Sequence, residues 1–341
     1  MSRISRKLEH IEYALKTGQN RTTGLDDITF VHRSLPQIAL DDVNLELKIG
    51  ELSLSSPIFI NAMTGGGGIE TEMINRDIAI AARESGIAMS VGSQMSALRD
   101  ENQKSTYQVV RKENPQGFIM GNIGGEATVD EAKRAIDMIE ANALQIHLNV
   151  IQELVMPEGD RDFRNVLHKI EEICSQVSVP VIVKEVGFGM SKETVTTLAS
   201  VGVTCVDISG SGGTNFAAIE NERRSRLLDF FNSWGITTSA SIIEATHVPN
   251  MHVLASGGIQ NGLDVAKCLS LGAKGVGVAG HLLKKYKEFG LQTLIDEINI
   301  IQQELSMVMT ALGVKRIDEL STVEKVITGD TLQWIKQRNL K

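Results

Sequence analysis

Cysteine is scarce in this chain of 341 residues, which has three: Cys174, Cys205 and Cys268. They stand singly in apolar surroundings without metal-ligand spacing, so we expect small buried side chains rather than a zinc site or a disulfide framework. A reactive thiol is the alternative for any one of them. An odd, unclustered count is typical of a reducing cytoplasm, and we expect that compartment here.

Other shortages narrow the class of protein. Aromatic residues make up only 4% of the chain while glycine is frequent, with 31 residues, which favours tight strand-to-helix turns over an aromatic-rich β-sandwich. No window approaches the ~20 apolar residues of a membrane helix, and no apolar run follows the basic residues near the N-terminus, so we predict neither a membrane span nor a signal peptide. With 34 basic against 42 acidic residues, the net charge of −8 argues against nucleic-acid or membrane-surface binding.

What the chain has in quantity is a regular alternation of short apolar runs and helical patterns. Eight apolar runs span residues 57–62, 88–92, 117–122, 144–149, 181–186, 203–208, 252–256 and 275–279. Helical periodicity separates them at 69–85, 103–114, 129–142, 163–177, 192–201, 239–246 and 263–271. Strands that are apolar throughout and alternate with helices are typical of a parallel sheet covered by helices. Eight such units within ~250 residues predict an α/β fold of the (β/α)₈ TIM-barrel type, and a doubly wound sheet is the rival architecture.

The two ends of the chain lie outside these repeats. Residues 4–15 have helical spacing, and residues 43–47 alternate as a strand would before Gly50. Apolar residues from Leu291 to Met309 predict an amphipathic helix that ends at Gly313, and the tail from Val314 predicts a small helical cover. We therefore expect an N-terminal extension over 1–50 and a barrel with C-terminal helices over 51–341.

Four polar residues crowd the end of the fourth run: His147, Asn149, Gln152 and Glu153. A polar group left unpaired in a protein interior costs ~1–3 kcal/mol, so such a set either builds a hydrogen-bond network or faces a ligand. Glu153 is the one hard oxygen donor among them and suits Mg²⁺ held mainly by waters and substrate phosphates.

Glycine-rich turns follow the last two runs, at 256–259 and 277–280. Barrels often bind phosphate with the loops after strands 7 and 8, where backbone N–H groups and a helix N-terminus meet the oxyanion. Lys184, at the end of the fifth run, must find an anion or lose its charge. One interpretation is an ion pair with Glu185 or Asp207. The second is a cation beside an anionic ring or phosphate. We favour the second, because polar residues also end the first three runs around the same barrel mouth.

These residues together resemble the type II isopentenyl-diphosphate isomerases, a family of FMN-dependent barrel enzymes, from residue 6 to about residue 320. The shared motifs are Arg6-Lys7 with His10, Asn-Ala-Met-Thr-Gly-Gly at 61–66, Val-Gly-Ser-Gln at 91–94, His-Leu-Asn-x-x-Gln-Glu at 147–153, Val-Lys-Glu-Val-Gly at 183–187, Ser-Gly-Gly-Thr at 211–214, Ser-Gly-Gly-Ile at 256–259 and Ala279-Gly280. FMN barrels in general share the glycine-rich pieces. The string at 147–153 and the Arg6-Lys7 pair are far more specific.

The resemblance implies an FMN cofactor held by strand-end residues. The flavin would contact Ala62, Met63, Thr64, Ser93, Asn122, Lys184 and Thr214, and its phosphate would contact Gly258, Ile259, Ala279 and Gly280.

The resemblance also implies a substrate diphosphate reached by Arg6, Lys7 and His10. Gln152 would lie near the reacting carbons, His147 and Asn149 would line the same pocket, and Glu153 would hold Mg²⁺. Several relatives carry arginine where this chain has Met95, so we expect no diphosphate contact from that position, and Arg99 is a candidate replacement.

The implied reaction converts isopentenyl diphosphate to dimethylallyl diphosphate, an isoprenoid precursor, by adding a proton at one carbon and removing another two carbons along. There is no net oxidation, so we expect reduced FMN to be the acid/base centre and NADPH to reduce it once. Catalytic roles are implied for Lys184, which would stabilise the anionic reduced ring, for Gln152, which would orient the substrate or relay a proton, and for His147.

The nearest rival function is FMN-dependent oxidation of a 2-hydroxy acid, which needs a histidine base with a nearby arginine at a late strand end. That place offers no His-x-x-Arg here, and only His281 is a candidate. A barrel that binds flavin or phosphate without catalysis, such as a sensor, is the alternative from another functional class. It would not explain the polar residues at 147–153. The resemblance further implies a homo-oligomer, a tetramer or octamer.

Overall fold

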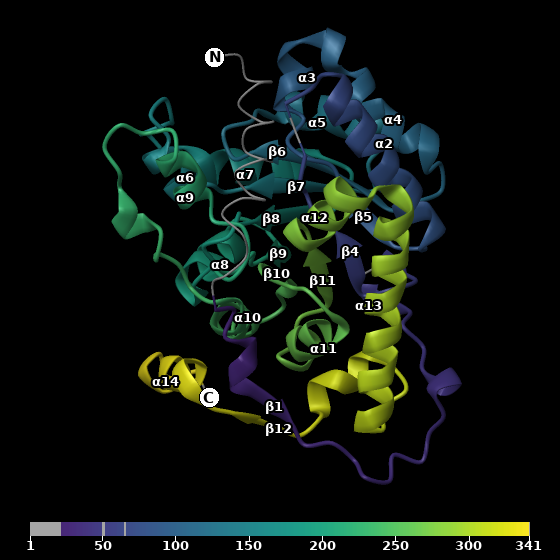
Figure 1. The fold of residues 1–341 in the computed structure, drawn as a ribbon. Helices are drawn as coiled ribbons and strands as arrows, with labels where there is room; N and C mark the ends of the chain where they lie inside the picture. The colour runs from purple at the N-terminus through teal and green to yellow at the C-terminus, as the bar shows by residue number, and fades with distance from the viewer. Residues whose placement is uncertain (1–21, 50–51, 65, 341) are drawn as a thin grey trace.

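The computed structural model describes residues 22–49, 52–64 and 66–340, and a closed barrel of eight parallel strands forms its centre (Figure 1). The strands are β4 (Ile58–Ile60), β5 (Ala88–Ser90), β6 (Ile119–Gly124), β7 (Ala143–His147), β8 (Val181–Lys184), β9 (Cys205–Asp207), β10 (His252–Ser256) and β11 (Gly275–Val278). They pair in sequence order, and β11 closes the barrel onto β4. The predicted TIM barrel is confirmed, since each apolar run overlaps one barrel strand.

Helices cover the outside of the barrel at the places that the periodicity predicts. They are α2 (Ile69–Glu84), α4 (Ser105–Glu113), α5 (Val129–Ile139), α7 (Val166–Gln176), α8 (Lys192–Ser200), α10 (Thr238–Thr246), α11 (Gly262–Ser270) and α13 (Leu291–Leu312). Four further helices that the sequence patterns do not predict follow β5, β7, β9 and β11: α3 (Met95–Arg99), α6 (Val150–Val155), α9 (Phe216–Asn221) and α12 (Gly280–Phe289). Three of them have five or six residues, too few for a helical period to stand out.

Inside the barrel the inward positions change from apolar to polar within two residues on each strand. Phe59, Ala88, Met120, Ala143, Ile182, Cys205 and Leu254 pack together as one cluster. Two residues further along the same strands stand Asn61, Ser90, Asn122, Gln145, Lys184, Asp207 and Ser256, each at most 5% exposed. We call this second set the polar layer. On β11 the corresponding residues are glycines, and a Cβ on Gly277 would lie 2.7 Å from the ring of Phe59. The apolar cluster therefore forms the floor on which the polar layer lies, toward the C-terminal strand ends.

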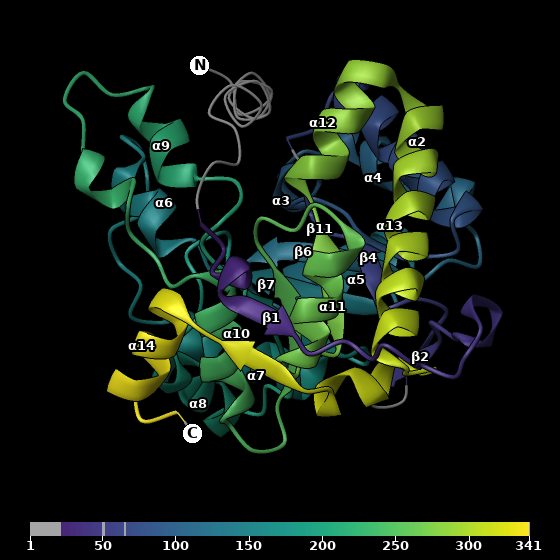
Figure 2. The ribbon, with the colours of Figure 1, turned by 60° about the horizontal axis from the view of Figure 1, so that its bottom comes forward.

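The first and last strands of the described chain pair with each other. Two predictions for the regions outside the barrel are corrected. β1 (Ile28–Phe30) pairs antiparallel with β12 (Lys325–Ile327), so the tail contains a strand besides the 3₁₀ helix η5 (Ile317–Thr322) and α14 (Gly329–Gln337) (Figure 2). The strand predicted at 43–47 is instead β2 (Leu47–Ile49), paired with β3 (Leu52–Leu54). Residues 43–45 form no ladder because Asn44 has only an isolated bridge to Arg316.

The helix predicted at residues 4–15 lies outside the described residues. Among the described helices, none combines the length and the apolar character that crossing a bilayer requires.

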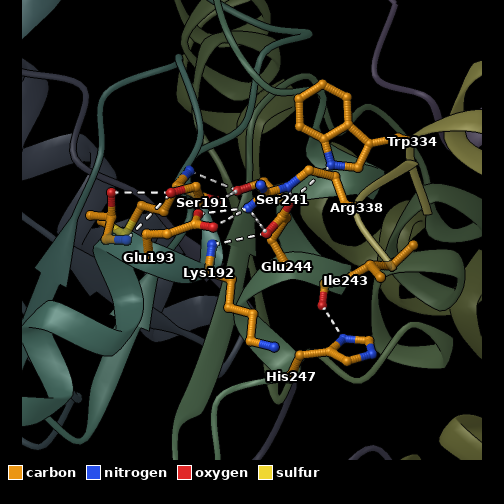
Figure 3. A network of polar contacts seen from close by, with 11 residues as sticks. Ser191, Lys192, Glu193, Ser241, Ile243, Glu244, His247, Trp334 and Arg338 are labelled. Atoms are coloured by element: carbon orange, nitrogen blue, oxygen red, sulfur yellow. Dashed lines mark hydrogen bonds and ion pairs between the residues drawn. The ribbon is translucent and has the colours of Figure 1, made fainter. Parts of the chain in front are cut away.

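A buried carboxylate fixes α14 to the barrel helices α10 and α8 (Figure 3). Glu244 of α10 is fully buried, and its Oε1 accepts hydrogen bonds from Trp334 Nε1 at 2.8 Å and Arg338 Nε at 2.7 Å. Its Oε2 accepts from the N–H of Lys192 at 3.0 Å, and Arg338 also pairs with Glu193. Burial alone would raise the pKa of Glu244, but the bonds from Arg338, Lys192 and Trp334 hold it below its ordinary value. The C-terminal helix is thus anchored by a charged contact.

Replacing Trp334 by phenylalanine should lower Tm, because it removes one donor from a buried carboxylate while keeping most of the ring's packing. Loss of a hydrogen bond to a charged group costs about 1.5–3 kcal/mol. Trp234→Phe is the matched control, since Trp234 is 55% exposed and surface changes stay within about 0.5 kcal/mol. Thermal unfolding of the two variants should therefore differ clearly at neutral pH, and equal Tm values would contradict the anchoring role.

The same variant should show a characteristic dependence on pH. Because the folded-state pKa of Glu244 is depressed, the stabilisation is present above the unfolded-state pKa of ~4.3 and is lost as the pH falls through the folded-state value. The Tm difference between Trp334→Phe and the unsubstituted protein should shrink in acid. A difference that stays constant below pH ~4 would show that lost packing, not the carboxylate, explains it.

Candidate functional site

A large cavity opens at the C-terminal ends of the barrel strands. Its lining includes Asn61, Ala62, Met63, Thr64, Gly92, Ser93, Asn122, His147, Gln152, Lys184, Ser209, Thr214, Gly258, Ile259, Ala279 and Gly280. Each of the eight strands, or the loop that follows it, contributes to this lining. The empty space is about 1290 Å³ with the open mouth included. A concave space at the C-terminal face of a barrel is the usual place for a small-molecule site.

The loops after β9 and β10 touch backbone to backbone on one side of the cavity, and glycines make this contact possible. A Cβ on Gly213 would lie 2.6 Å from the N atom of Gly258, and a Cβ on Gly258 would lie 2.5 Å from the O atom of Gly212. Gly258 also has a φ of +79°, which residues with a side chain rarely adopt. The two loops can therefore approach this closely only because these positions carry no side chain.

Backbone N–H groups on the same side are suited to an anion. Within the described chain, the N–H groups of Gly258, Ile259 and Gly280 donate to no backbone carbonyl, and all three residues line the cavity. Gly280 is the first residue of α12, where the helix leaves its N–H groups without internal partners. Such a turn and helix N-terminus together favour phosphate.

Lys184 brings a buried cation to the cavity from the end of β8, where it is 5% exposed. Its Nζ donates a hydrogen bond to the carbonyl of Glu185 at 2.6 Å. Of the two ion pairs weighed from the sequence, with Glu185 and with Asp207, neither forms in the described part of the chain. An ammonium has three donors, so this arrangement leaves capacity for an anionic ligand.

Glu185 turns its carboxylate away from Lys184 and toward its own loop. Its Oε2 accepts from the N–H groups of Val186, Gly187 and Phe188 at 2.6, 2.7 and 2.5 Å. Burial raises the pKa of Glu185 to about 7, against the opposing effects of these three N–H groups and of Lys184. The carboxylate therefore shapes the loop after β8, and the cation beside it is the charge that the cavity meets.

The polar residues at 147–153 lie partly at the end of β7 and partly on α6. His147 ends β7 and its Nδ1 lies 2.9 Å from Oδ1 of Asn122 on the neighbouring strand. Gln152 is buried on α6 and donates from Nε2 to Oε1 of Glu220 at 3.1 Å. Glu220, on α9, is fully buried and pairs with Arg223 at 2.6 Å. α6 and α9 lie side by side at one edge of the molecule (Figure 2), so a buried charge pair fixes the position of Gln152.

Glu153 and Asn149 lie beside the cavity and do not belong to its lining. Glu153 Oε1 accepts from Asn149 Nδ2 at 2.8 Å, and Oε2 accepts from the N–H of Asp160 at 2.9 Å. A search of the described residues finds no cluster of three histidine, cysteine or acidic side chains that would hold a metal ion by themselves. A carboxylate has about four lone-pair sites, so Glu153 keeps capacity for Mg²⁺ that is held mainly by waters and phosphate.

Several predicted candidates stand elsewhere. Met95 is buried in α3, and Arg99 at the end of that helix lies 4.0 Å from Glu126. His281 contacts Glu297 at 2.5 Å. Met95, from which no contact was expected, does not line the cavity, and neither do the candidates Arg99 and His281. Arg6, Lys7 and His10 lie outside the described residues.

Other cavity residues are absent from the sequence prediction, namely Val186, Gly187, Ser209, Gly213, Phe216 and Leu283. Asp207, Gln145 and Glu220 are also absent as site residues, although they bond to residues that line the cavity. One signal was available for Asp207 and Gln145, because each interrupts an apolar run with a polar side chain. For Glu220 no signal exists, because only the fold brings α9 to α6.

Comparison with known proteins places the chain within two nested groups. The family model described as FMN-dependent dehydrogenase matches residues 99–326. The isopentenyl-diphosphate delta-isomerase of Geobacillus sp. (strain WCH70) is 57% identical over 339 residues, which cover 99% of this chain and 97% of that protein. The protein of the same name from Bacillus mycoides (strain KBAB4) is 60% identical over 341 residues, covering 100% of this chain and 98% of that protein.

Solved structures share the fold at low sequence identity. A flavocytochrome b2 variant with pyruvate bound has a TM-score of 0.70 at 18% identity, covering 95% of this chain and 83% of that one. A mandelate oxidase variant has a TM-score of 0.65 at 18% identity and covers 89% of each chain. These likenesses show the barrel fold alone.

The glycine contacts predict a matched pair of variants for FMN binding. Gly258→Ala places a Cβ 2.5 Å from the O atom of Gly212, whereas Gly290→Ala meets nothing within 4 Å. Both glycines have a similar positive φ, +79° and +84°, so the backbone strain is matched. Quenching of flavin fluorescence should show FMN affinity lowered at least ~10-fold in Gly258→Ala only, a loss of about 1.4 kcal/mol. Equal affinities would contradict the assignment of this turn to the cofactor.

Proposed function

The chain belongs to the FMN-dependent isopentenyl-diphosphate delta-isomerases, and from this membership we propose that its barrel cavity converts isopentenyl diphosphate to dimethylallyl diphosphate. One observation supports the proposal most strongly. A cavity bounded by all eight strand ends combines an N–H-lined turn, a buried cation and a positioned amide. These are the groups that a flavin phosphate, an anionic ring and a substrate require.

The residues on the cavity wall suit FMN. The turn at 256–259 and the N-terminus of α12 would hold its phosphate through N–H groups that have no backbone acceptor. Ala62, Met63, Thr64, Ser93, Asn122 and Thr214 would contact the flavin, and each lines the cavity. When bound and reduced, FMN supplies the acid and base that move the double bond without net oxidation.

Lys184 would act electrostatically. Its buried ammonium makes a single hydrogen bond to the described residues, to the carbonyl of Glu185, and no carboxylate neutralises it by direct pairing. A fixed cation in a site that excludes water stabilises negative charge more strongly than the same cation in solvent. Lys184 would therefore hold the anionic form of the reduced ring at the cavity wall.

Gln152 would orient the reacting end of the substrate. Its Nε2 is committed to Glu220, and Arg223 in turn holds Glu220. The amide oxygen of Gln152 is then the group offered to the ligand, with an orientation fixed by a buried ion pair. Because an alkene is a weak base and its allylic C–H a weak acid, the exclusion of water around this end matters for either proton transfer.

The diphosphate would bind at the cavity mouth. Glu153 would hold Mg²⁺ as its single protein carboxylate, which suits an ion bound mainly by waters and phosphates. Arg6, Lys7 and His10 would neutralise the remaining charge of the diphosphate. Arg99 is already paired with Glu126 and does not line the cavity, so it offers no replacement for a contact at Met95. NADPH would reduce the FMN, and a homo-oligomer in the cytoplasm is the proposed state.

Oxidation of a 2-hydroxy acid finds little support in this cavity. The fold neighbours include a mandelate oxidase and a flavocytochrome b2, yet His281, the histidine candidate for that reaction, contacts Glu297 away from the cavity lining. No observation favours this second function.

An anaerobic assay with reduced FMN and Mg²⁺ tests the proposed function directly. The protein should convert isopentenyl diphosphate to dimethylallyl diphosphate, and Lys184→Ala should lower kcat ~100-fold, as loss of one electrostatic group typically does. Lys267→Ala is the control, because it truncates another buried lysine, on α11. Absence of conversion by the unsubstituted protein would refute the function, whereas full turnover by Lys184→Ala would refute only the role of Lys184.

The assignment of Glu153 predicts a changed requirement for metal. Glu153→Gln keeps the shape but loses the charge, so the Mg²⁺ concentration at half-maximal rate should rise at least ~10-fold. Asp162→Asn is the control, since Asp162 is an exposed carboxylate of the following loop that pairs with Arg164. A Mg²⁺ titration that is the same for Glu153→Gln as for the unsubstituted protein would remove Glu153 as a ligand.

A further inference from the structure

A row of hydrogen bonds links His147 to Asp207 through residues of the polar layer. The four links are His147 Nδ1 to Asn122 Oδ1 at 2.9 Å, Asn122 Nδ2 to Gln145 Oε1 at 3.1 Å, Gln145 Nε2 to Asn61 Oδ1 at 3.3 Å and Asn61 Nδ2 to Asp207 Oδ2 at 2.7 Å. His147, Asn122 and Asn61 line the cavity, whereas Gln145 and Asp207 are fully buried and do not. The last two therefore act on a ligand only through the others.

Asp207 determines which group donates and which accepts in this row of hydrogen bonds. Its carboxylate also accepts from Ser256 Oγ at 2.7 Å and from the N–H of Ser209 at 3.1 Å. An ionised carboxylate only accepts hydrogen bonds, so Asn61 must present its NH₂ group to Asp207. The N–H of Ala62, which only donates, reaches Asn61 Oδ1 at 2.8 Å and fixes the same orientation independently.

The orientation then passes from one amide to the next. Because the oxygen of Asn61 points toward Gln145, Gln145 must donate to it through Nε2. The oxygen of Gln145 then accepts from Ser90 Oγ at 2.6 Å and from Asn122 Nδ2. Asn122 has only its oxygen left for His147, so the nitrogen that faces it, Nδ1, must carry the proton.

We propose that Asp207 and Gln145 are positioning residues that hold His147 in the Nδ1–H tautomer. Nε2 of the neutral imidazole is then the ring nitrogen that accepts a hydrogen bond. The inference depends on the proposed function only for the kcat measurement, since the tautomer follows from the protein's own hydrogen bonds.

Two substitutions interrupt this row of hydrogen bonds at residues that do not line the cavity. Gln145→Met keeps a similar length but removes both the donor and the acceptor. Asp207→Asn cannot satisfy its neighbours in either orientation, because Asn61 Nδ2 and the N–H of Ser209 both need an acceptor. Ser90→Ala is the matched control, since it removes a buried hydrogen bond to the same oxygen of Gln145 and leaves the direction of this row of hydrogen bonds intact.

The test is ¹⁵N NMR of the FMN-loaded protein labelled at histidine, with the His147 signal assigned by its loss in His147→Asn. In the unsubstituted protein and in Ser90→Ala, His147 should be a single tautomer protonated at Nδ1. In Gln145→Met and Asp207→Asn the signal should move toward the Nε2–H tautomer or a mixture. The kcat of these two variants should fall ~10–100-fold, as loss of an orienting partner typically does, with little change in KM.

Two results would overturn the proposal. One is an Nε2–H tautomer of His147 in the unsubstituted protein, which needs no variant to fold. The other is a Ser90→Ala protein that loses as much kcat as Gln145→Met, which would show that packing alone explains the loss. Only the second result needs the substrate, because the tautomer is measured in the resting protein, so a failed isomerase assay and a failed tautomer assignment are separate outcomes.

Discussion

The buried carboxylate of Asp207 is the constraint on which the site depends. Eleven hydrogen-bonding side-chain atoms of the polar layer would be costly inside a barrel if they had no partners. Asp207 accepts from three of its neighbours, and through Asn61 and Gln145 its influence reaches both sides of the barrel interior. Six of the seven residues of the polar layer therefore bond to one another, and Asn61, Asn122 and Lys184 of this layer line the cavity together with His147. A ligand meets a surface whose donors and acceptors are already oriented.

The floor beneath this layer and the glycines beside it have separate tasks. Seven apolar side chains fill the lower barrel, and their burial supplies the stabilisation that a polar layer alone would not. On β11 glycine replaces the side chains at both inward positions, which leaves space for Phe59 and Asn61. The glycines after β9 and β10 let those two loops touch backbone to backbone. The charge of Lys184 comes from the end of β8, and the amide of Gln152 comes from α6, which follows the neighbouring strand β7.

Much of this architecture is predictable from the sequence, for a physical reason. Barrel strands are buried on both faces, so they appear as eight apolar runs, and the helices between them keep a clear period. The cavity residues from Ala62 to Gly280 are predictable because they sit at strand ends and match a family's motifs. The pairing of β1 with β12 is not, because three-residue strands far apart in the sequence carry no pattern of their own. Nor is the bond between Gln152 and Glu220, which exists only because α6 and α9 meet in space.

The central claim is that this cavity moves protons between carbons while the flavin stays reduced overall. Incubation with isopentenyl diphosphate in D₂O under anaerobic conditions, followed by mass spectrometry of the product, measures this most directly. The account predicts dimethylallyl diphosphate that carries solvent deuterium when the FMN is reduced, and no product when the FMN is oxidised. Conversion at the same rate with oxidised FMN, or product that carries no solvent deuterium, would contradict it.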